Sequence, residues 1–199
     1  MHTADTLTNL QKFLTLLNPS LNLNAMLTNV ARQLVEMFEV DHSGVLFFDE
    51  TDVEGLVIAE YPHQGAVALK VPLTEYPLMD RMKVERKPLQ VEDAQNDPRM
   101  GSARPTMRLL GIRSIVIIPL VVQDKLVGSL SLDAVRQPRS FTPADLELYA
   151  IIGKQIAVAV DYTRALETVE AHRRQAETLY EVNRVLSESL DPDEILPLI

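Results

Sequence analysis

The stretch after residue 143 constrains the fold of this chain more than any other. No proline occurs between residues 144 and 191, and Gly153 is the only glycine there. Proline and glycine are the residues that disfavour a helix interior most strongly. The stretch is therefore expected to form one continuous helix, roughly 70 Å long at the usual rise per residue.

Within this helix, apolar residues follow the alternating four- and three-residue spacing of a coiled coil, starting at Leu148. The spacing continues through Tyr162 and Ala165 to six residues, hereafter the dimer seam: Val169, His172, Ala176, Leu179, Asn183 and Leu186. A heptad of this kind is what two supercoiled helices require. We predict a homodimer through the dimer seam, because the chain has nothing else against which residues 162–190 could pack.

A single amphipathic helix that lies on its own domain is the alternative. It suits residues 144–160, where a second set of apolar residues can face a sheet: Leu146, Ile152, Ile156 and Ala159. We expect this first part of the helix to have both roles.

Two polar residues give the dimer seam specific properties. Asn183 falls at the first heptad position, and a single asparagine that faces its twin costs stability but selects a parallel two-stranded register. Two facing His172 imidazoles would repel each other when protonated, which gives the hypothesis that the affinity of the dimer depends on pH.

The end of the chain repeats the pattern of its beginning. Residues 179–199 match residues 10–30 at identical positions that include Leu179, Leu186, Ser189, Leu190 and Leu196. Asn22 falls opposite Asp191, and both residue types cap helix N-termini. The repeat predicts tandem modules, with one module ending near residue 160 and a second beginning near the end of the chain.

The charge balance and the absence of cysteine exclude several classes of function. The chain has 28 Asp and Glu residues against 19 Lys and Arg, which opposes binding to nucleic acid and to anionic lipid. Without cysteine, disulfides, thiolate metal sites, catalytic thiols and thioether-linked cofactors are excluded. The longest apolar run is far shorter than the roughly 20 residues of a membrane span, and no signal peptide precedes the first helix. We expect a cytoplasmic protein with no nucleic-acid partner and no membrane insertion.

Hydrophobic periodicity predicts an α+β fold. Helices are expected at residues 7–17 and 23–38, with short helices at 77–83 and 105–110. Strands are expected at residues 43–49, 56–61, 66–73, 89–92, 114–122 and 126–135, and a loop at 93–104. The long helix should begin with Thr142 as its cap and Asp145 as the acid of a capping box. This order gives an antiparallel six-stranded sheet with the N- and C-terminal helices on one face and loops and short helices on the other.

Five segments carry a family resemblance. They are L-V-E-M-F-E-V-D-H-S-G-V-L-F-F-D at 34–49, P-L-Q-V-E-D-A at 88–94, L-G-I-R-S-I-V-I-I-P-L at 110–120, L-V-G-S-L-S-L-D at 126–133 and F-T-P-A-D-L-E-L at 141–148. Through them the chain resembles a GAF domain, a member of the GAF/PAS-like folds. The resemblance implies a GAF domain at 1–160, a coiled-coil signalling linker helix at 161–190 and the start of a truncated second module at 191–199. Similar proteins are usually bacterial sensors with a histidine kinase, nucleotide cyclase, phosphodiesterase or transcriptional activator farther along.

The family binds different ligands, and the residues of this chain argue against several. Covalent bilin attachment and the free methionine sulfoxide reductase activity both need cysteine. Cyclic-nucleotide members carry an Asn-Lys pair, absent here, and an F-x-x-x-D-E motif, in which Phe141 and Asp145 match but Leu146 replaces the glutamate. Haem-binding members need a positioned histidine, and haem is not expected here. The cofactor and the identity of the small molecule stay open.

Family geometry implies a ligand cavity on the sheet face opposite the long helices, under the loops of residues 74–110. Along strand 126–133, Ser129, Ser131 and Asp133 point to one face, and the leucines between them point to the other. The remaining candidates are Tyr76, Met79, Met107 and Leu110 as apolar walls, with Asp93 and Arg99 at the rim. The alternative is that the serines face solvent or a collapsed polar interior that binds no ligand.

Other candidate sites have simpler interpretations. His63, in a Pro-His-Gln-Gly turn, and His42, at the start of a strand, are interpreted as solvated histidines, because neither has a second metal ligand at helical or strand spacing. Residues 50–61 copy half of a calcium loop, but Tyr61 replaces the final glutamate, so a charged hairpin turn is expected.

Two functions therefore remain. The first is a regulatory sensor module that binds a small molecule and signals through the dimeric helix to an output domain. The second is a ligand-free dimerisation and spacer module. An enzyme is not expected within this sequence, which lacks a recognisable nucleophile–base pair, phosphate loop or pair of catalytic acids.

Overall fold

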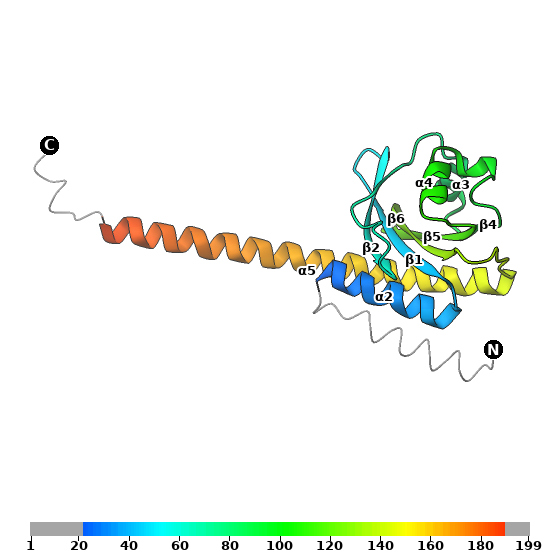
Figure 1. Ribbon diagram of the computed structural model, residues 1–199. Coiled ribbons are helices and arrows are strands. Elements are labelled where there is room, and N and C mark those ends of the chain that lie inside the picture. Colours follow the sequence, from blue (N-terminus) through cyan, green and yellow to red (C-terminus); the bar gives the residue numbers. More distant parts are fainter. Residues whose placement is uncertain (1–21, 190–199) are drawn as a thin grey trace, which may run out of the picture.

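The computed structural model describes residues 22–189, in which a six-stranded sheet separates two layers of helices (Figure 1). Every strand pair is antiparallel, and the strand order is β3-β2-β1-β6-β5-β4. The strands are β1 (His42–Phe48), β2 (Glu54–Tyr61), β3 (Lys70–Pro72), β4 (Leu89–Val91), β5 (Ser114–Val122) and β6 (Lys125–Ala134). The predicted α+β fold with an antiparallel six-stranded sheet is confirmed.

Helices α2 (Leu23–Phe38) and α5 (Pro143–Ser189) cover one face of the sheet. Asn22 caps α2 by accepting a hydrogen bond from the backbone N–H of Ala25 at 2.8 Å. Thr142 and Asp145 form the predicted capping box of α5, since each side chain accepts from the backbone N–H of the other residue. Under these helices lies a core to which the sheet contributes Val45, Val116, Ile118, Leu130 and Leu132.

The opposite face of the sheet is covered by α3 (Pro77–Glu85), the 3₁₀ helix η1 (Pro98–Ala103) and α4 (Arg104–Leu109). A second core fills this layer, and four of its members are methionines: Met79, Met82, Met100 and Met107. Methionine side chains are unbranched and adapt to irregular gaps. The short helices of this layer can therefore pack on the sheet without a regular pattern of their own.

Two glycines permit close approaches between elements. A Cβ atom on Gly128 would lie 2.2 Å from the backbone oxygen of Leu46. Strand β1 therefore approaches β6 too closely at this position for any side chain on β6. A Cβ atom on Gly153 would lie 2.6 Å from Cγ2 of Ile118, where α5 packs on β5. The only glycine of the long helix thus lies where the helix packs directly on the sheet.

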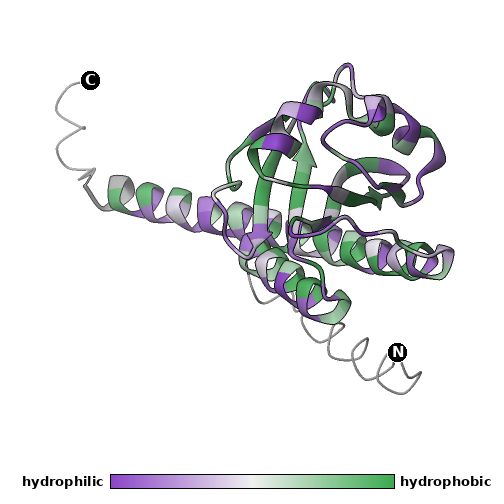
Figure 2. Cartoon of the chain, turned by 45° about the vertical axis from the view of Figure 1, so that its right-hand side comes forward, coloured by the Kyte–Doolittle hydropathy of each residue, from purple (hydrophilic) through white to green (hydrophobic). Residues whose placement is uncertain are grey.

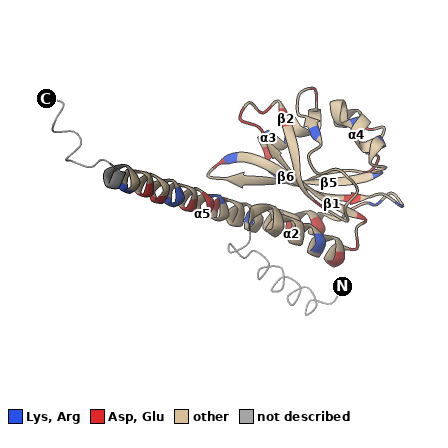
Figure 3. Ribbon diagram, turned by 60° about the vertical axis from the view of Figure 1, so that its left-hand side comes forward, with Lys and Arg blue, Asp and Glu red and all other residues tan. Residues whose placement is uncertain are grey.

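Helix α5 lies on the sheet in its first part and then protrudes from the domain (Figure 1). The first part buries one face, which includes Tyr149, Ile152, Ile156, Val160 and Thr163. From Glu167 to Val185 every side chain is exposed. Acidic and basic residues alternate along this part (Figure 3), with ion pairs one turn apart such as Arg174–Glu170 at 3.3 Å. Hydrophobic residues also continue along it (Figure 2).

Two predicted segments differ in the structure. The alternating residues 66–73 form a strand only at Lys70–Pro72, because the N–H groups of Ala66 and Val67 donate to the carboxylate of Glu60 and Ala68 has a left-handed φ of 70°. The predicted loop at 93–104 contains η1, whose cap Asp97 accepts from the N–H of Arg99. The predicted helix at 7–17 and the predicted second module at 191–199 lie outside the described residues.

Candidate functional site

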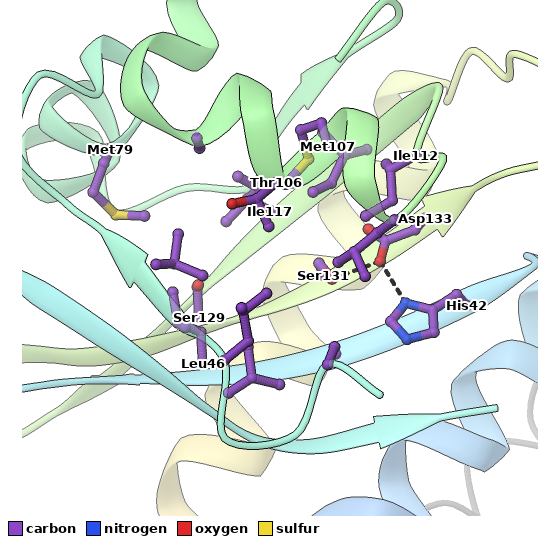
Figure 4. Close-up of a pocket in the computed structure, with 18 of the residues that line it drawn as sticks. His42, Leu46, Met79, Thr106, Met107, Ile112, Ile117, Ser129, Ser131 and Asp133 are labelled. Atoms are coloured by element: carbon purple, nitrogen blue, oxygen red, sulfur yellow. Dashed lines mark hydrogen bonds and ion pairs between the residues drawn. The ribbon is translucent and has the colours of Figure 1, made fainter. Parts of the chain in front are cut away.

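A cavity of about 80 Å³ lies between the sheet and the layer of short helices (Figure 4). Seven of the nine predicted ligand-binding residues line it: Tyr76, Met79, Met107, Leu110, Ser129, Ser131 and Asp133. Most of the other lining residues are aliphatic: Leu46, Val57, Leu69, Val71, Ile112, Ile115 and Ile117. The cavity is therefore mostly apolar, and its polar side chains are three from β6 together with His42, Tyr76 and Thr106 from other elements.

Strand β6 carries the polar groups because of its alternation. Ser129, Ser131 and Asp133 face the cavity, while Leu130 and Leu132 are buried in the core under α2 and α5. The register of β1 against β6 pairs Asp133 with His42 and Ser131 with Gly44. Directly opposed residues of an antiparallel pair project to the same face, so His42 joins the cavity wall beside Asp133.

His42 lies between two carboxylates. Its Nδ1 lies 2.7 Å from Oδ2 of Asp133, and its Nε2 lies 3.2 Å from Oε2 of Glu60. All three side chains are buried. Burial lowers the pKa of His42, but the hydrogen bonds and negative charges of Asp133 and Glu60 outweigh it and hold that pKa above its usual value. A proton on His42 is therefore stabilised by both acids.

Glu60 connects His42 to the segment that closes one side of the cavity. Its Oε1 accepts hydrogen bonds from the backbone N–H groups of Gly65, Ala66 and Val67 at 3.0, 2.9 and 3.3 Å, and Nδ1 of His63 lies 2.7 Å away. Burial raises the pKa of Glu60, but the hydrogen bond from His42 and those from the backbone outweigh it and keep the pKa low. The charged carboxylate thereby fixes the turn that places Ala66 in the cavity wall.

Asp133 has one carboxylate oxygen in this network and one outside it. Its Oδ2 lies next to His42 and also accepts a hydrogen bond from Oγ of Ser131 at 3.0 Å. Its Oδ1 is buried and has no hydrogen-bond partner among residues 22–189. Burial, together with the negative charge of Asp133, raises the pKa of the neighbouring Tyr76 well above its usual value, so this phenol stays neutral in the cavity wall.

The structure corrects the interpretation of His42 and places two candidates away from the cavity. His42 is 3% exposed rather than solvated, because its partner Asp133 comes from a strand 91 residues later. The side chain of His63 is 77% exposed. Asp93 accepts from the side-chain amide of Asn96, and Arg99 pairs with Asp97 at 2.6 Å. Neither Asp93 nor Arg99 lines the cavity.

The dimer seam lies on the protruding part of α5. Val169, His172, Ala176, Leu179 and Asn183 are all exposed, and the side chain of Leu186 lies outside the described residues. Closer to the domain, Ile151, Val158 and Tyr162 continue the same spacing and are exposed as well. Helix α5 therefore has two apolar stripes, one buried against the sheet and one uncovered.

Residues 22–189 contain neither a cluster of metal ligands nor a membrane-spanning helix. Three or more His, Asp or Glu side chains do not converge there on a point that could hold a metal ion, since His42 meets its two acids with opposite ring nitrogens. In the same residues, the helices that are long enough to cross a membrane are not apolar enough to do so.

Comparisons with known proteins agree with this architecture. The sequence profile of the GAF domain family matches residues 22–160. The solved GAF domain of an Acinetobacter phosphoenolpyruvate-protein phosphotransferase is similar with a TM-score of 0.67 and 19% identity, over 83% of this chain and 97% of that chain. A GAF domain of a phosphoenolpyruvate-protein phosphotransferase from Coxiella burnetii has a TM-score of 0.70 and 20% identity, over 84% and 99%.

A third similar structure carries a ligand. The phycoerythrobilin-bound GAF domain from a cyanobacterial phytochrome has a TM-score of 0.66 and 20% identity, over 83% of this chain and 100% of that chain. No curated protein sequence matches the chain. At these identities the structural similarity establishes the fold only. The ligand of this chain has to be inferred from the residues of its own cavity.

Proposed function

The chain belongs to the GAF domain family, and from that membership we propose that it is a regulatory sensor module, in which a small molecule in the cavity acts through helix α5 on an output domain farther along. GAF domains are typically regulatory modules that sense small molecules and are not themselves catalytic. One observation carries the proposal for this chain. Strand β6 presents Ser129, Ser131 and Asp133 to the cavity on one face and Leu130 and Leu132 to the helix layer on the other.

The path of the signal follows from this two-faced strand. A ligand that displaces β6 moves Leu130 and Leu132 in the core under α2 and α5, and the chain runs from β6 through Phe141 directly into α5. Close packing allows a few discrete arrangements of helix on sheet rather than a continuous range. A ligand shifts the balance between two arrangements only if it binds one of them better.

The output end of the path is a homodimer. The uncovered stripe of α5, from Ile151 to the dimer seam, has the spacing of a coiled coil, and exposed apolar residues at that spacing are stabilised by a second copy. Asn183 favours a parallel pair, in which both domains lie at the same end. We further propose that residues 1–160 form the sensor, 161–190 the linker and 191–199 the start of the next module.

A second candidate is a ligand-free spacer that only sets the distance between two helices. The size of the cavity favours it, because about 80 Å³ is small beside the roughly 300–1,000 Å³ of drug-sized ligand pockets. The sensor proposal therefore requires a small ligand, and a tetrapyrrole the size of a bilin would need the cover of the cavity to move.

Native mass spectrometry and thermal shifts separate the two candidates. The sensor proposal expects a retained small molecule, or a metabolite in a panel that raises the melting temperature. A variant that fills the cavity, Ser129→Met, should lose this response, while Ser140→Met on the exposed surface should keep it. A dimer that holds no small molecule and responds to none in the panel would favour the spacer.

A further inference from the structure

We propose that the cavity selects small organic amines, with a protonated amine donating a hydrogen bond to Oδ1 of Asp133 and a short alkyl group lying between the aliphatic walls. This rests on the proposed sensor function and names the ligand class of the same site.

Among residues 22–189, one acceptor of the buried network around His42 has no hydrogen-bond donor. Of the four carboxylate oxygens of Glu60 and Asp133, three have partners: both oxygens of Glu60 and Oδ2 of Asp133. Only Oδ1 of Asp133 has none among residues 22–189, and the residue is 1% exposed. A buried acceptor without a donor is costly, and nearly all such atoms in folded proteins are satisfied. The missing group is therefore a donor.

The position of this oxygen makes it available to a ligand. Asp133 lines the cavity, and in Figure 4 the second oxygen points away from His42, on the side of the carboxyl that is nearest Ile112. A donor that binds this oxygen would leave the hydrogen bonds of Oδ2 undisturbed. The network behind Asp133 would then hold the carboxylate in one orientation before the ligand arrives.

The charge around the site favours a cation over an anion. Asp133 in the wall and Glu60 behind it are two acids around one imidazole, so the network is net negative even when His42 is protonated, and both ring nitrogens of His42 are already engaged. Among residues 22–189 no lysine or arginine lines the cavity. A carboxylate or phosphate would meet only hydroxyl donors there and would lie close to Asp133, which is unfavourable in a site of low polarity.

The walls limit the rest of the ligand. Most of the other lining side chains are aliphatic or methionine, including Leu46, Met79, Met107 and Ile117. A short alkyl chain suits these walls and the volume of about 80 Å³. The polar partners beyond Asp133 are hydroxyls such as those of Ser129 and Thr106, so a second charged group on the ligand would lack a counter-charge.

The methionines of the domain allow a direct test by NMR of ¹³C-methyl-labelled protein. Met79 and Met107 line the cavity, while Met26 and Met37 lie in the core on the other face of the sheet and serve as internal controls. The whole chain is titrated with n-propylammonium, n-propanol and propionate, which each have three carbon atoms and carry different polar groups. We expect saturable shifts of the Met79 and Met107 methyls with n-propylammonium, at an affinity at least about tenfold above that of the other two.

Variants locate the contact. Asp133→Asn should weaken the binding of n-propylammonium by about tenfold or more, whereas Asp93→Asn, outside the cavity, should not change it. Unchanged Met26 and Met37 resonances would confirm that the variant is folded. Propionate or propanol binding as tightly as the amine, or an Asp133→Asn domain that binds it equally well, would overturn the amine assignment while leaving a small-molecule site. Cavity methyls that respond to none of the three probes would overturn the amine assignment, while the sensor proposal would still be decided by the retained ligand and the metabolite panel.

Discussion

Nδ1 of His42 lies 2.7 Å from Oδ2 of Asp133, and this contact joins the first strand of the domain to the last across the centre of the sheet. His42 also reaches Glu60 on β2, so one imidazole connects three neighbouring strands. The same contact holds the carboxylate that faces the cavity. The stability of the domain and the geometry of the site therefore depend on one side chain.

Replacing His42 by alanine should destabilise the domain strongly. Asp133 and Glu60 would remain buried without the cation between them, and breaking a buried pair by removing one partner typically costs about 3–5 kcal/mol. The free energy of unfolding, measured by urea denaturation, should fall by that amount. His63→Ala is the matched control, since this exposed imidazole contacts the same Glu60 and should cost less than about 1 kcal/mol. Equal losses in the two variants would contradict the role given to His42.

Stability should also decrease as the pH rises above neutrality. The pKa of His42 is higher in the folded protein than its ordinary value of 6.5, so the folded state holds this proton more tightly. The stabilisation is complete below 6.5 and is lost as the pH rises through the folded pKa, by about 1.4 kcal/mol for each unit by which that pKa is raised. Urea denaturation between about pH 6 and 9 should reveal this loss. It should disappear in His42→Gln and persist in His63→Gln; a wild-type profile that is flat or rising would refute it.

A charge in the dimer seam should separate the dimer. Leu179 and Val185 are exposed to nearly the same extent, 57% and 56%, but only Leu179 lies at a position that faces the partner in the predicted register. Leu179→Glu should shift the protein to monomer in analytical ultracentrifugation, and Val185→Glu should leave it dimeric. If both variants stay dimeric, or the unmodified chain is a monomer at high concentration, the dimer seam is wrong.

The affinity of this dimer should depend on His172. In a parallel pair the two imidazoles face each other, and their protonation at acidic pH places two like charges in the interface. The dissociation constant should therefore rise between about pH 8 and pH 5. His172→Gln should remove most of that dependence, since glutamine stays neutral. An unmodified dimer whose affinity is constant over this range would rule out facing histidines.

Sequence periodicity is sufficient to predict the six-stranded antiparallel sheet, helices α2 and α5 and one wall of the cavity. The alternation along β6 predicts which face Ser129, Ser131 and Asp133 occupy, and the structure places them on the cavity. The capping residues Asn22 and Thr142 were predicted from local chemistry alone. These features depend on residues close together in the chain, where spacing determines direction.

His42 and Glu60 were missed because their environment depends on strand pairing. A histidine at a strand start is buried or solvated according to its neighbours, and its neighbour here is 91 residues away. The signal available in the sequence is a pair of acids, Glu60 and Asp133, within strands whose other charged residues, Glu54 and Lys125, stand only at the first position. Only the antiparallel register of β1 with both β2 and β6 brings them to the same imidazole.

The absence of any break in α5 has a mechanical consequence. The last residue that the helix buries is Thr163, and the helix continues to Ser189, about 40 Å farther at the usual rise per residue. A rigid arm of that length turns a tilt of about 5° at its base into a swing of about 3 Å at its tip. Without a hinge to absorb it, a displacement too small to alter the domain's outline becomes a change of spacing for whatever the arm holds.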